Sequence, residues 1–127
     1  PDNIFTAGFL GSPAMNFIPC CIKDGSISIN GCRLILNEIQ KSKMQNRKEI
    51  ILGIRPESFN TSGADFEFNA EIEISEMLGS SQAVYFKAEN KDCCALLSPE
   101  INLQGLYAFS VNTNSIYFFD ADTGLRV

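Results

Sequence analysis

The 127-residue sequence contains no histidine. Histidine is the side chain that most often serves as a general base near neutral pH. The sequence also lacks a Gly-x-Ser-x-Gly motif and the Gly-x-x-x-x-Gly-Lys-Ser/Thr loop that cradles phosphates. These absences exclude the commonest kinds of catalytic site, and we predict that this chain has no catalytic residues of its own.

Cysteine is present, but not at metal-binding spacing. No Cys-x-x-Cys pair occurs, so a zinc site would need four thiolates drawn from scattered positions. Neighbouring residues on a strand point to opposite faces, so adjacent cysteines do not readily bond to each other. We therefore predict no metal site and interpret the cysteines as small hydrophobic side chains in a reducing cytosol. They are Cys20, Cys21, Cys32, Cys93 and Cys94.

Basic residues are few. Ten Lys and Arg stand against fifteen Asp and Glu, giving a net charge of −5 and a pI of about 4.6. Proteins that bind nucleic acids gain most of their affinity by neutralising phosphates, so this balance disfavours that class. The one basic cluster, residues 41–48, has no interleaved aromatic residues for base stacking. We interpret it as a solvated loop or helix face.

Long apolar runs are also absent. No stretch approaches the ~20 residues that span a bilayer, and no signal peptide is visible. The length suits one domain with a modest core, and 45% hydrophobic residues are enough for it to fold. Because residue 1 is proline, we expect the chain to be a piece of a longer protein.

Short apolar runs separated by turn residues fill most of the sequence. Asn30-Gly31 lies between two such runs and is a strong hairpin signal. Residues 66–78 alternate apolar and polar side chains, as in a strand with one buried face. The run 49–55 is nearly continuously apolar, so we expect a central strand. Further strands are expected over 15–22, 26–36, 82–89, 93–97, 106–111 and 115–120, with a loop or short helix over 37–48 and a short helix over 1–11.

This pattern predicts an all-β fold, an OB-like small barrel or sandwich of eight or nine short strands with a short N-terminal helix. Two strand groups, 15–55 and 66–119, are joined by an expected loop over 56–65.

Two acidic patterns resemble functional sites but have simpler explanations. Strand alternation accounts for most of the carboxylate row on 66–78 as a solvated face. Residues 120–124, Asp-Ala-Asp-Thr-Gly, resemble the opening of a calcium loop, but the chain ends before such a loop is complete, so we predict a turn. The row consists of Glu67, Glu71, Glu73 and Glu76.

The strand over 49–55 ends unusually, on Arg55-Pro56-Glu57. Proline has no N–H to donate, so it ends ladder pairing, and it holds Arg55 extended with its side chain directed outward. The guanidinium is then free to pair with a carboxylate, either Glu57 or one in a partner. The alternative is that these residues only terminate the strand.

At this corner the sequence resembles a known family. "GIRPE" (53–57) is the signature of the C-terminal regulatory domain, the transport-associated OB domain, of ATP-binding cassette importer ATPases of the maltose and sugar-phosphate type. Further matches follow in order along the chain. They are "PDNIFTAGFLGSPAMNFI" (1–18), "EISEMLGSSQAVYF" (73–86) and "IYFFDADTGLRV" (116–127).

The resemblance implies that residues 1–11 are the tail of the last helix of an ATPase module and that 12–127 are the regulatory domain. It implies upstream Walker motifs that bind ATP and Mg²⁺, transmembrane permease subunits as partners, and a bacterial, peripheral membrane protein on the cytoplasmic face that takes up a sugar or related solute. It also implies a homodimeric contact and, in some members, a cytosolic regulator. The regulatory and interface residues it implies are Phe17, Gly53, Arg55, Pro56, Glu57 and Gly79, with Phe17 and Gly79 near the corner.

Some features depart from the family. Residues 20–48 match no pattern that identifies the solute, and the Cys20-Cys21 and Cys93-Cys94 pairs are not family features. The main alternative is a β-barrel that binds a small ligand or oxyanion, although the "SARN" type of motif of related molybdate-binding domains is absent. A single-strand nucleic-acid binder is disfavoured by the net charge.

Overall fold

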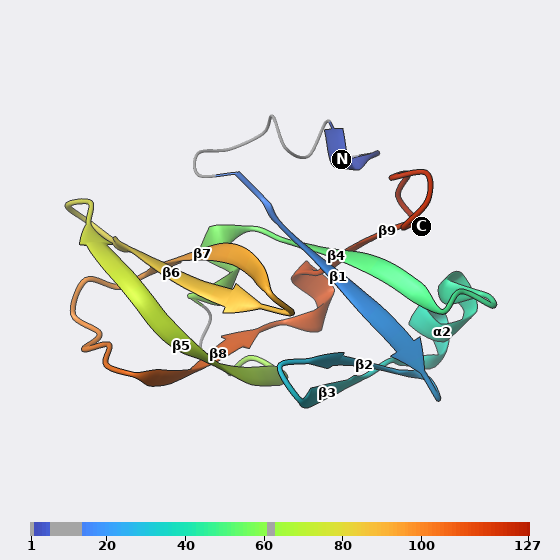
Figure 1. The fold of residues 1–127 in the computed structure, drawn as a ribbon, viewed down its shortest axis with the longest axis horizontal. Coiled ribbons are helices and arrows are strands. Elements are labelled where there is room, and N and C mark those ends of the chain that lie inside the picture. Colours follow the sequence, from blue (N-terminus) through green and yellow to red (C-terminus); the bar gives the residue numbers. More distant parts are fainter. Residues whose placement is uncertain (1, 6–13, 61–62) are drawn as a thin grey trace.

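The computed structural model describes residues 2–5, 14–60 and 63–127 (Figure 1). Strands make up most of the regular structure. In chain order the elements are β1 (Asn16–Lys23), β2 (Ser26–Ile29), β3 (Cys32–Ile35), α2 (Glu38–Met44), β4 (Glu49–Ile54), the 3₁₀ turn η1 (Pro56–Phe59), β5 (Phe66–Met77), β6 (Gln82–Ala88), β7 (Lys91–Leu97), β8 (Leu106–Val111), the 3₁₀ turn η2 (Thr113–Ser115) and β9 (Tyr117–Phe119).

These strands form two antiparallel sheets. The five-stranded sheet has the order β3-β2-β1-β4-β9, and the four-stranded sheet has the order β7-β6-β5-β8. The predicted all-β, OB-like fold is confirmed. The predicted grouping 66–119 needs one correction, because β9 leaves the second group and pairs with β4 of the first sheet. Strand β4 is therefore central, as predicted, with β1 on one side and β9 on the other.

The predicted hairpin at Asn30-Gly31 is confirmed, with φ values of 50° and 84° at these residues. The Asn30 side chain also joins the two sheets. Its amide nitrogen donates to the carbonyl oxygens of Asn69 and Lys87 at 3.0 Å each, and its Oδ1 accepts from the Glu89 N–H at 3.0 Å. The turn that the sequence identifies thus fixes the hairpin against the β6–β7 turn.

The polar segment 37–48 contains α2, which agrees with the expected loop or short helix. Asn37 caps its N-terminus in a capping box with Gln40. The lysines of the basic cluster are exposed, but Met44 is buried and Arg47 donates to Asp120 at 2.8 Å. The interpretation as a solvated face therefore holds for its lysines.

The main core lies between the sheets and is rich in phenylalanine. Phe59, which the sequence placed in a loop, sits at its centre as the last residue of η1. Its ring meets those of Phe68, Phe86 and Phe109 edge to face, with centroids 6.1, 5.6 and 5.9 Å away. The segment after Arg55 is thus a compact turn that delivers an aromatic anchor to the core.

The N-terminal segment can be compared with its prediction only in part. Residues 1 and 6–13, which carry most of the expected helix over 1–11 and the proposed domain boundary, lie outside the described residues. In the described part, Ile4 and Phe5 are helical and Asn3 bridges Leu125. The Ile4 N–H donates to the Gly124 carbonyl at 3.0 Å, so the two ends of the chain lie side by side.

All five cysteines carry free thiols. Burial raises the pKa of the Cys20 thiol to about 12 and that of the Cys93 thiol to about 11. A protonated thiol is a poor nucleophile and a poor metal ligand, so these residues act as small apolar side chains. Burial agrees with the predicted role as small hydrophobic side chains for Cys20, Cys93 and Cys94, whereas Cys32 is half-buried and Cys21 is exposed.

Residues 120–124 form a turn, as predicted. Asp120 Oδ1 accepts the N–H groups of Asp122 and Thr123, and Oδ2 accepts from Arg47. The Arg47 hydrogen bond, aided by the two backbone N–H groups, lowers the Asp120 pKa to about 2. The carboxylate is thus fully engaged within the fold.

The Asp120→Asn variant is expected to flatten the acid side of the pH–stability curve. A carboxyl whose pKa is lowered by folding stabilises the protein above its unfolded pKa of 3.8, and this contribution is lost as the pH falls toward about 2. Urea denaturation at several pH values between about 2 and 7 measures it. The control is Asp122→Asn, in the same turn; equal pH dependence of the two variants contradicts the assignment.

Candidate functional site

The corner after β4 is built by proline, as the sequence suggests. Arg55 is extended, with φ −71° and ψ 144°, and β4 ends at Ile54. Pro56 opens η1, in which the Ser58 N–H donates to the Arg55 carbonyl at 2.9 Å. Pro56 is buried and Glu57 is exposed. The charged residues therefore lie where the backbone leaves the sheet and turns toward the core.

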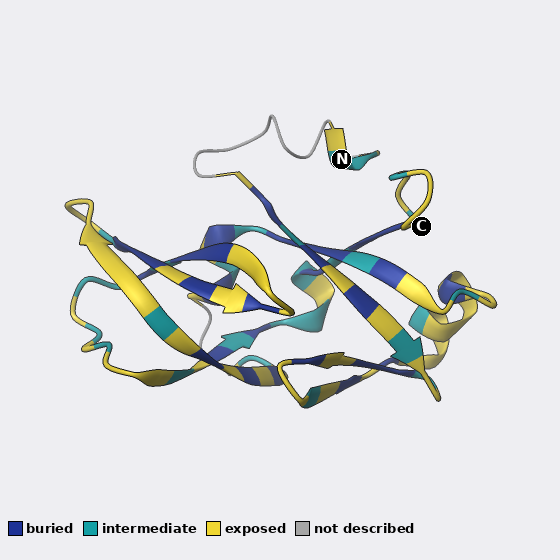
Figure 2. Ribbon diagram, viewed as in Figure 1, coloured by how far each residue is buried: buried dark blue, intermediate teal, exposed yellow. Residues whose placement is uncertain are grey.

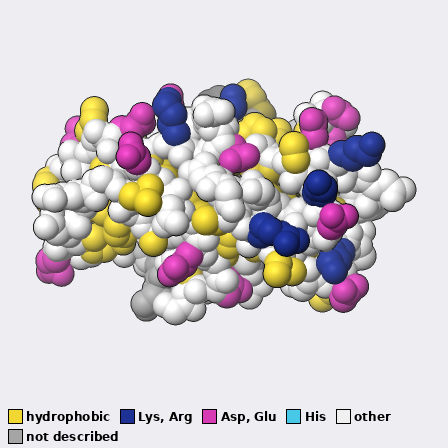
Figure 3. All heavy atoms as spheres, turned by 60° about the horizontal axis from the view of Figure 1, so that its bottom comes forward, with side chains coloured by type: hydrophobic (Ala, Val, Ile, Leu, Met, Phe, Trp, Pro, Cys, Tyr) yellow, Lys and Arg dark blue, Asp and Glu magenta, His cyan; other side chains and the backbone are white. Residues whose placement is uncertain are grey.

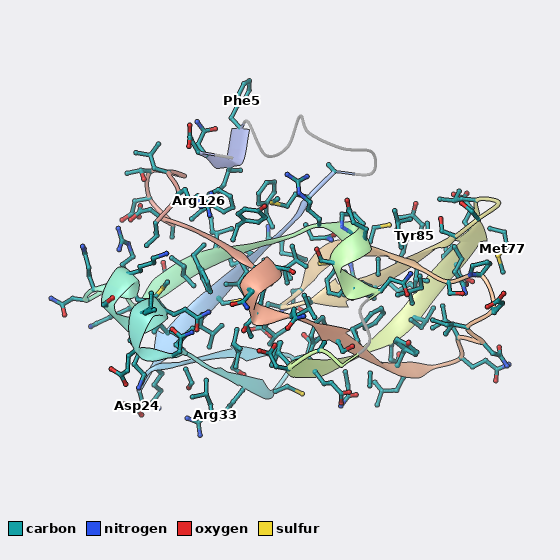
Figure 4. All side chains as sticks on the ribbon, turned by 180° about the vertical axis from the view of Figure 1, so that it is seen from behind. Phe5, Asp24, Arg33, Met77, Tyr85 and Arg126 are labelled. Atoms are coloured by element: carbon teal, nitrogen blue, oxygen red, sulfur yellow. The ribbon has the colours of Figure 1, made fainter. Side chains whose placement is uncertain are left out.

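The Arg55 side chain lies over an aromatic ring rather than against a carboxylate. Its guanidinium carbon is 5.9 Å from the Tyr117 ring centroid, and that of Arg126 is 5.0 Å from the same ring. Among the ion pairs of the described residues there is none between Arg55 and Glu57, so Glu57 is not the predicted partner. We call Arg55, Tyr117 and Arg126 the Arg–Tyr–Arg cluster. Figure 4 labels Arg126 beside the C-terminal segment.

Strand register places two predicted residues beside this cluster. Gly53 of β4 pairs with Phe17 of β1 on one side and with Tyr117 of β9 on the other. Residues directly opposite each other share a sheet face, so the three lie in one row on the face away from the main core. The Phe17 ring meets that of Phe119 edge to face at 5.9 Å.

Gly53 is required by close packing. A Cβ atom there would lie 2.6 Å from Met15 Sδ and 2.6 Å from Phe119 Cε2. Met15 and Phe119 form a second small core on this outer face, with Ile4, Phe17, Ile51 and Tyr117 packed against it. This second core explains why β4 is apolar on both faces, and Tyr117 packs against it.

Gly79 is not part of this arrangement. It has φ +86° in the turn between β5 and β6, where only a residue tolerant of the left-handed region fits without strain. That turn ends the hairpin at the left of Figure 1, in the other sheet, whereas Gly53 and Phe17 lie in the five-stranded sheet. The structure thus groups Phe17, Gly53 and Arg55 but leaves Gly79 apart.

The cluster presents positive charge on an acidic domain. Neither Arg55 nor Arg126 belongs to an ion pair formed within residues 2–5, 14–60 and 63–127. Arg55 is half-buried and Arg126 exposed, and stacking on Tyr117 orients both guanidinium groups. Such an arrangement suits recognition of carboxylates rather than catalysis. In the described stretches, no group of three or more His, Cys, Asp and Glu is placed to hold a metal ion.

Sequence reasoning missed Tyr117 and Arg126. They lie about half the chain away from Arg55, and the β4–β9 pairing that joins them follows no local rule. The signal that was available is the closing segment 116–127, which belongs to the same resemblance as "GIRPE" and contains both residues.

Comparison with known proteins agrees with the fold. Residues 11–59 match the family described as the MalK OB fold domain. The matched segment contains β1 to β4 and ends at Phe59, so it covers the corner and its aromatic anchor. Over residues 11–59, therefore, the chain is similar to an OB-fold domain of the MalK type.

The similar proteins that match the whole chain, or nearly all of it, are named as ATP-binding proteins of importers. The oligosaccharides import ATP-binding protein MsmX of Bacillus subtilis is 33% identical over 100% of this chain and 38% of its own length. The multiple sugar-binding transport ATP-binding protein MsmK of Streptococcus mutans is 35% identical over 97% of this chain and 36% of its own. The sn-glycerol-3-phosphate import ATP-binding protein UgpC of Ruegeria pomeroyi is 29% identical over 100% and 36%. The chain thus spans little more than a third of the relatives it matches.

None of the helices in the described residues is long and apolar enough to cross a membrane.

Proposed function

We propose that this MalK-type OB domain is the C-terminal regulatory and dimerisation domain of the ATP-binding subunit of an importer for a sugar or related solute. One observation carries the proposal: relatives named as import ATP-binding proteins match nearly the whole chain with little more than a third of their own length. The remaining part of such a protein is where an ATPase module belongs.

In this proposal an upstream module binds ATP and Mg²⁺, hydrolyses ATP and contacts transmembrane permease subunits at the cytoplasmic face of a bacterial membrane. The OB domain performs no catalysis and links two ATP-binding subunits. Sequencing the gene upstream of the Pro1 codon tests this placement. A P-loop and an ATP-binding cassette signature in the same reading frame support it. A start codon close to Pro1 with no ATPase before it contradicts it.

The Arg–Tyr–Arg cluster is the proposed contact surface for the partner subunit or a regulator. Its two guanidinium groups have no carboxylate partner among the described residues, and they are held on a rigid aromatic platform. Charged pairs across an interface fix partner choice and register. Carboxylates of the opposing surface are the groups this cluster is suited to bind.

Charge reversal at Arg55 is expected to weaken self-association. Arg55→Glu places a carboxylate where the proposed interface needs a cation, and we expect the dissociation constant of the dimer to rise about tenfold or more. Sedimentation equilibrium of the full-length protein measures it, because ATPase modules contribute to such dimers.

The matched control is Lys23→Glu, which makes the same charge change on an exposed residue at the other end of β1. Thermal unfolding of the domain should be nearly unchanged in both variants. Equal dimer dissociation constants for the two variants contradict the role of the cluster.

A small-ligand site is the second candidate. A hollow of about 240 Å³ lies between α2 and the C-terminal segment, with Lys43 on one side and Tyr117 and Arg126 on the other. Two cations beside a hollow suit a small anion. A saturable rise of the melting temperature with inorganic phosphate favours this reading, since a ligand that binds only the folded state stabilises it.

A further inference from the structure

The outer half of β5 is a free sheet edge. Strand β5 pairs with β8 from Phe66 to Glu71 and with β6 from Ile72 to Met77. The last hydrogen bond on the β8 side of β5 runs from the Ile72 N–H to the Gly105 carbonyl at 2.9 Å, just before β8 begins. In the part of the chain that the structure describes, no strand pairs with residues 73–77 on the side away from β6. This half of β5 runs with β6 to the hairpin tip at the left of Figure 1.

The hairpin turn determines which backbone groups face this edge. The Leu78 N–H donates to the Ser81 carbonyl at 2.9 Å, which makes Leu78 and Ser81 a hydrogen-bonded pair. Such pairs alternate along an antiparallel ladder. Glu76 therefore bonds to β6, whereas the backbone N–H and C=O groups of Ser75 and Met77 point away from β6. These groups are placed to bind one more strand.

Apolar side chains surround the same edge. Ile74 is 64% exposed, Met77 65% and Leu106, at the start of β8, 66%. Figure 2 shows the outer half of β5 as almost continuously exposed, and Figure 4 shows Met77 at the end of the molecule remote from Arg126. Large apolar side chains gathered at an exposed site mark a contact surface more often than isolated ones do.

The charge of this edge is negative. Glu71, Glu73 and Glu76 are exposed along β5, and the nearby Lys87 is engaged with Asp92 at 2.7 Å. Figure 3 shows most of the visible Lys and Arg side chains toward the opposite end of the molecule. A second copy of this edge is a poor partner, because antiparallel self-pairing of Ser75 with Met77 places the Glu76 residues of the two copies opposite each other, and like charges across strands repel.

We propose that residues 73–77 of β5 bind an extended, basic peptide segment of a protein partner as an added strand. The outward backbone groups of Ser75 and Met77 supply the hydrogen bonds, as in other cases of strand addition. Met77 contacts apolar side chains of the peptide on one face of the strand. Glu73 and Glu76 pair with its Lys or Arg on the other face, where the aliphatic stems of these basic residues cover Ile74. The bulge at Glu73, where the register with β6 shifts, limits the free edge at its inner end.

A synthetic peptide of alternating lysine and valine tests the proposal against the 127-residue chain. We expect saturable binding by fluorescence anisotropy and slower amide hydrogen exchange at Ser75 and Met77. Ser75→Pro removes one outward N–H without touching the β6 ladder, so it should weaken binding about fivefold or more. Ser75→Ala is the matched control and should bind like the wild type.

Three results overturn the proposal. One is the absence of saturable binding, or equal binding of a peptide with the same composition but its lysines and valines in separate blocks. Another is unchanged affinity in Ser75→Pro together with loss in a Glu73→Gln/Glu76→Gln variant, which indicates charge attraction without strand addition. A third is protection of Ser75 and Met77 that rises with protein concentration alone, which makes a second copy the occupant.

Discussion

Replacing Phe59 with alanine is expected to lower the free energy of unfolding by about 3–5 kcal/mol. Phe59 is 3% exposed and touches three other phenylalanine rings edge to face. Its loss removes a large buried surface and three aromatic contacts at once, and it leaves a cavity between the two sheets. Because η1 is a short turn held by this anchor, the Arg55 corner should also become more mobile. Urea denaturation followed by circular dichroism measures the stability.

Two further variants sharpen this test. Phe59→Leu keeps an apolar side chain and should lose less than half as much stability as the alanine variant. Ile35→Ala changes a side chain that is 73% exposed and should cost well under 1 kcal/mol. A loss in Phe59→Ala no larger than that of Ile35→Ala shows that the turn is not anchored by Phe59.

Replacing Asn16 with alanine is expected to cost about 3 kcal/mol or more. Asn16 is 6% exposed, and its side-chain nitrogen donates to the carbonyls of Ile54 and Cys94 at 2.9 Å each. Its Oδ1 accepts the Cys94 N–H at 2.7 Å. Alanine removes the side-chain partner of the buried Cys94 N–H and C=O groups, which carry a desolvation penalty, and one hydrogen bond to the Ile54 carbonyl. Thermal and urea unfolding measure the loss.

Asn16→Asp distinguishes lost hydrogen bonds from lost packing, because it keeps the shape of the side chain. A carboxylate accepts the Cys94 N–H as before, but it faces the carbonyls of Ile54 and Cys94 without a proton to donate. The neutral acid should therefore be favoured in the folded state, and the stability deficit relative to the wild type should grow as the pH rises above about 4. A deficit independent of pH contradicts this account.

Phe59 and Asn16 both connect the two sheets close to the candidate site. Asn16 precedes Phe17, whose ring packs against Phe119 in the second core, together with Tyr117. The Asn16 side chain also fixes the start of β1 against β7. Asn30 joins the other end of the five-stranded sheet to the β6–β7 turn. Among the described residues, no comparable hydrogen bond ties the outer half of β5 to the five-stranded sheet, and this half is exposed.

Much of the fold follows from local rules. Alternation predicted β5, Asn30-Gly31 predicted the β2–β3 hairpin, and Pro56 predicted the end of β4. Each of these features depends on the side-chain period or on the φ angle that a residue allows. Alternation failed beyond Ile72, where β5 leaves the core and Ile74 and Met77 are exposed. The burial of Phe59 was not predicted within the expected loop over 56–65, since a single aromatic residue in a polar segment carries no periodic signal.

The sequence alone determined the strands, the turns, the acidic charge and the likeness to MalK-type domains, because these depend on residues near one another in the chain. The tertiary structure decided which distant segments of the chain pair with each other and which strand edge stays unpaired. Pairing of β4 with β9 brought Tyr117 and Arg126 to Arg55, and the end of β8 pairing at Glu71 left the edge of β5 free. Such contacts depend on which strands close the two sheets, and this choice is made by the packing of the whole core rather than by any local pattern.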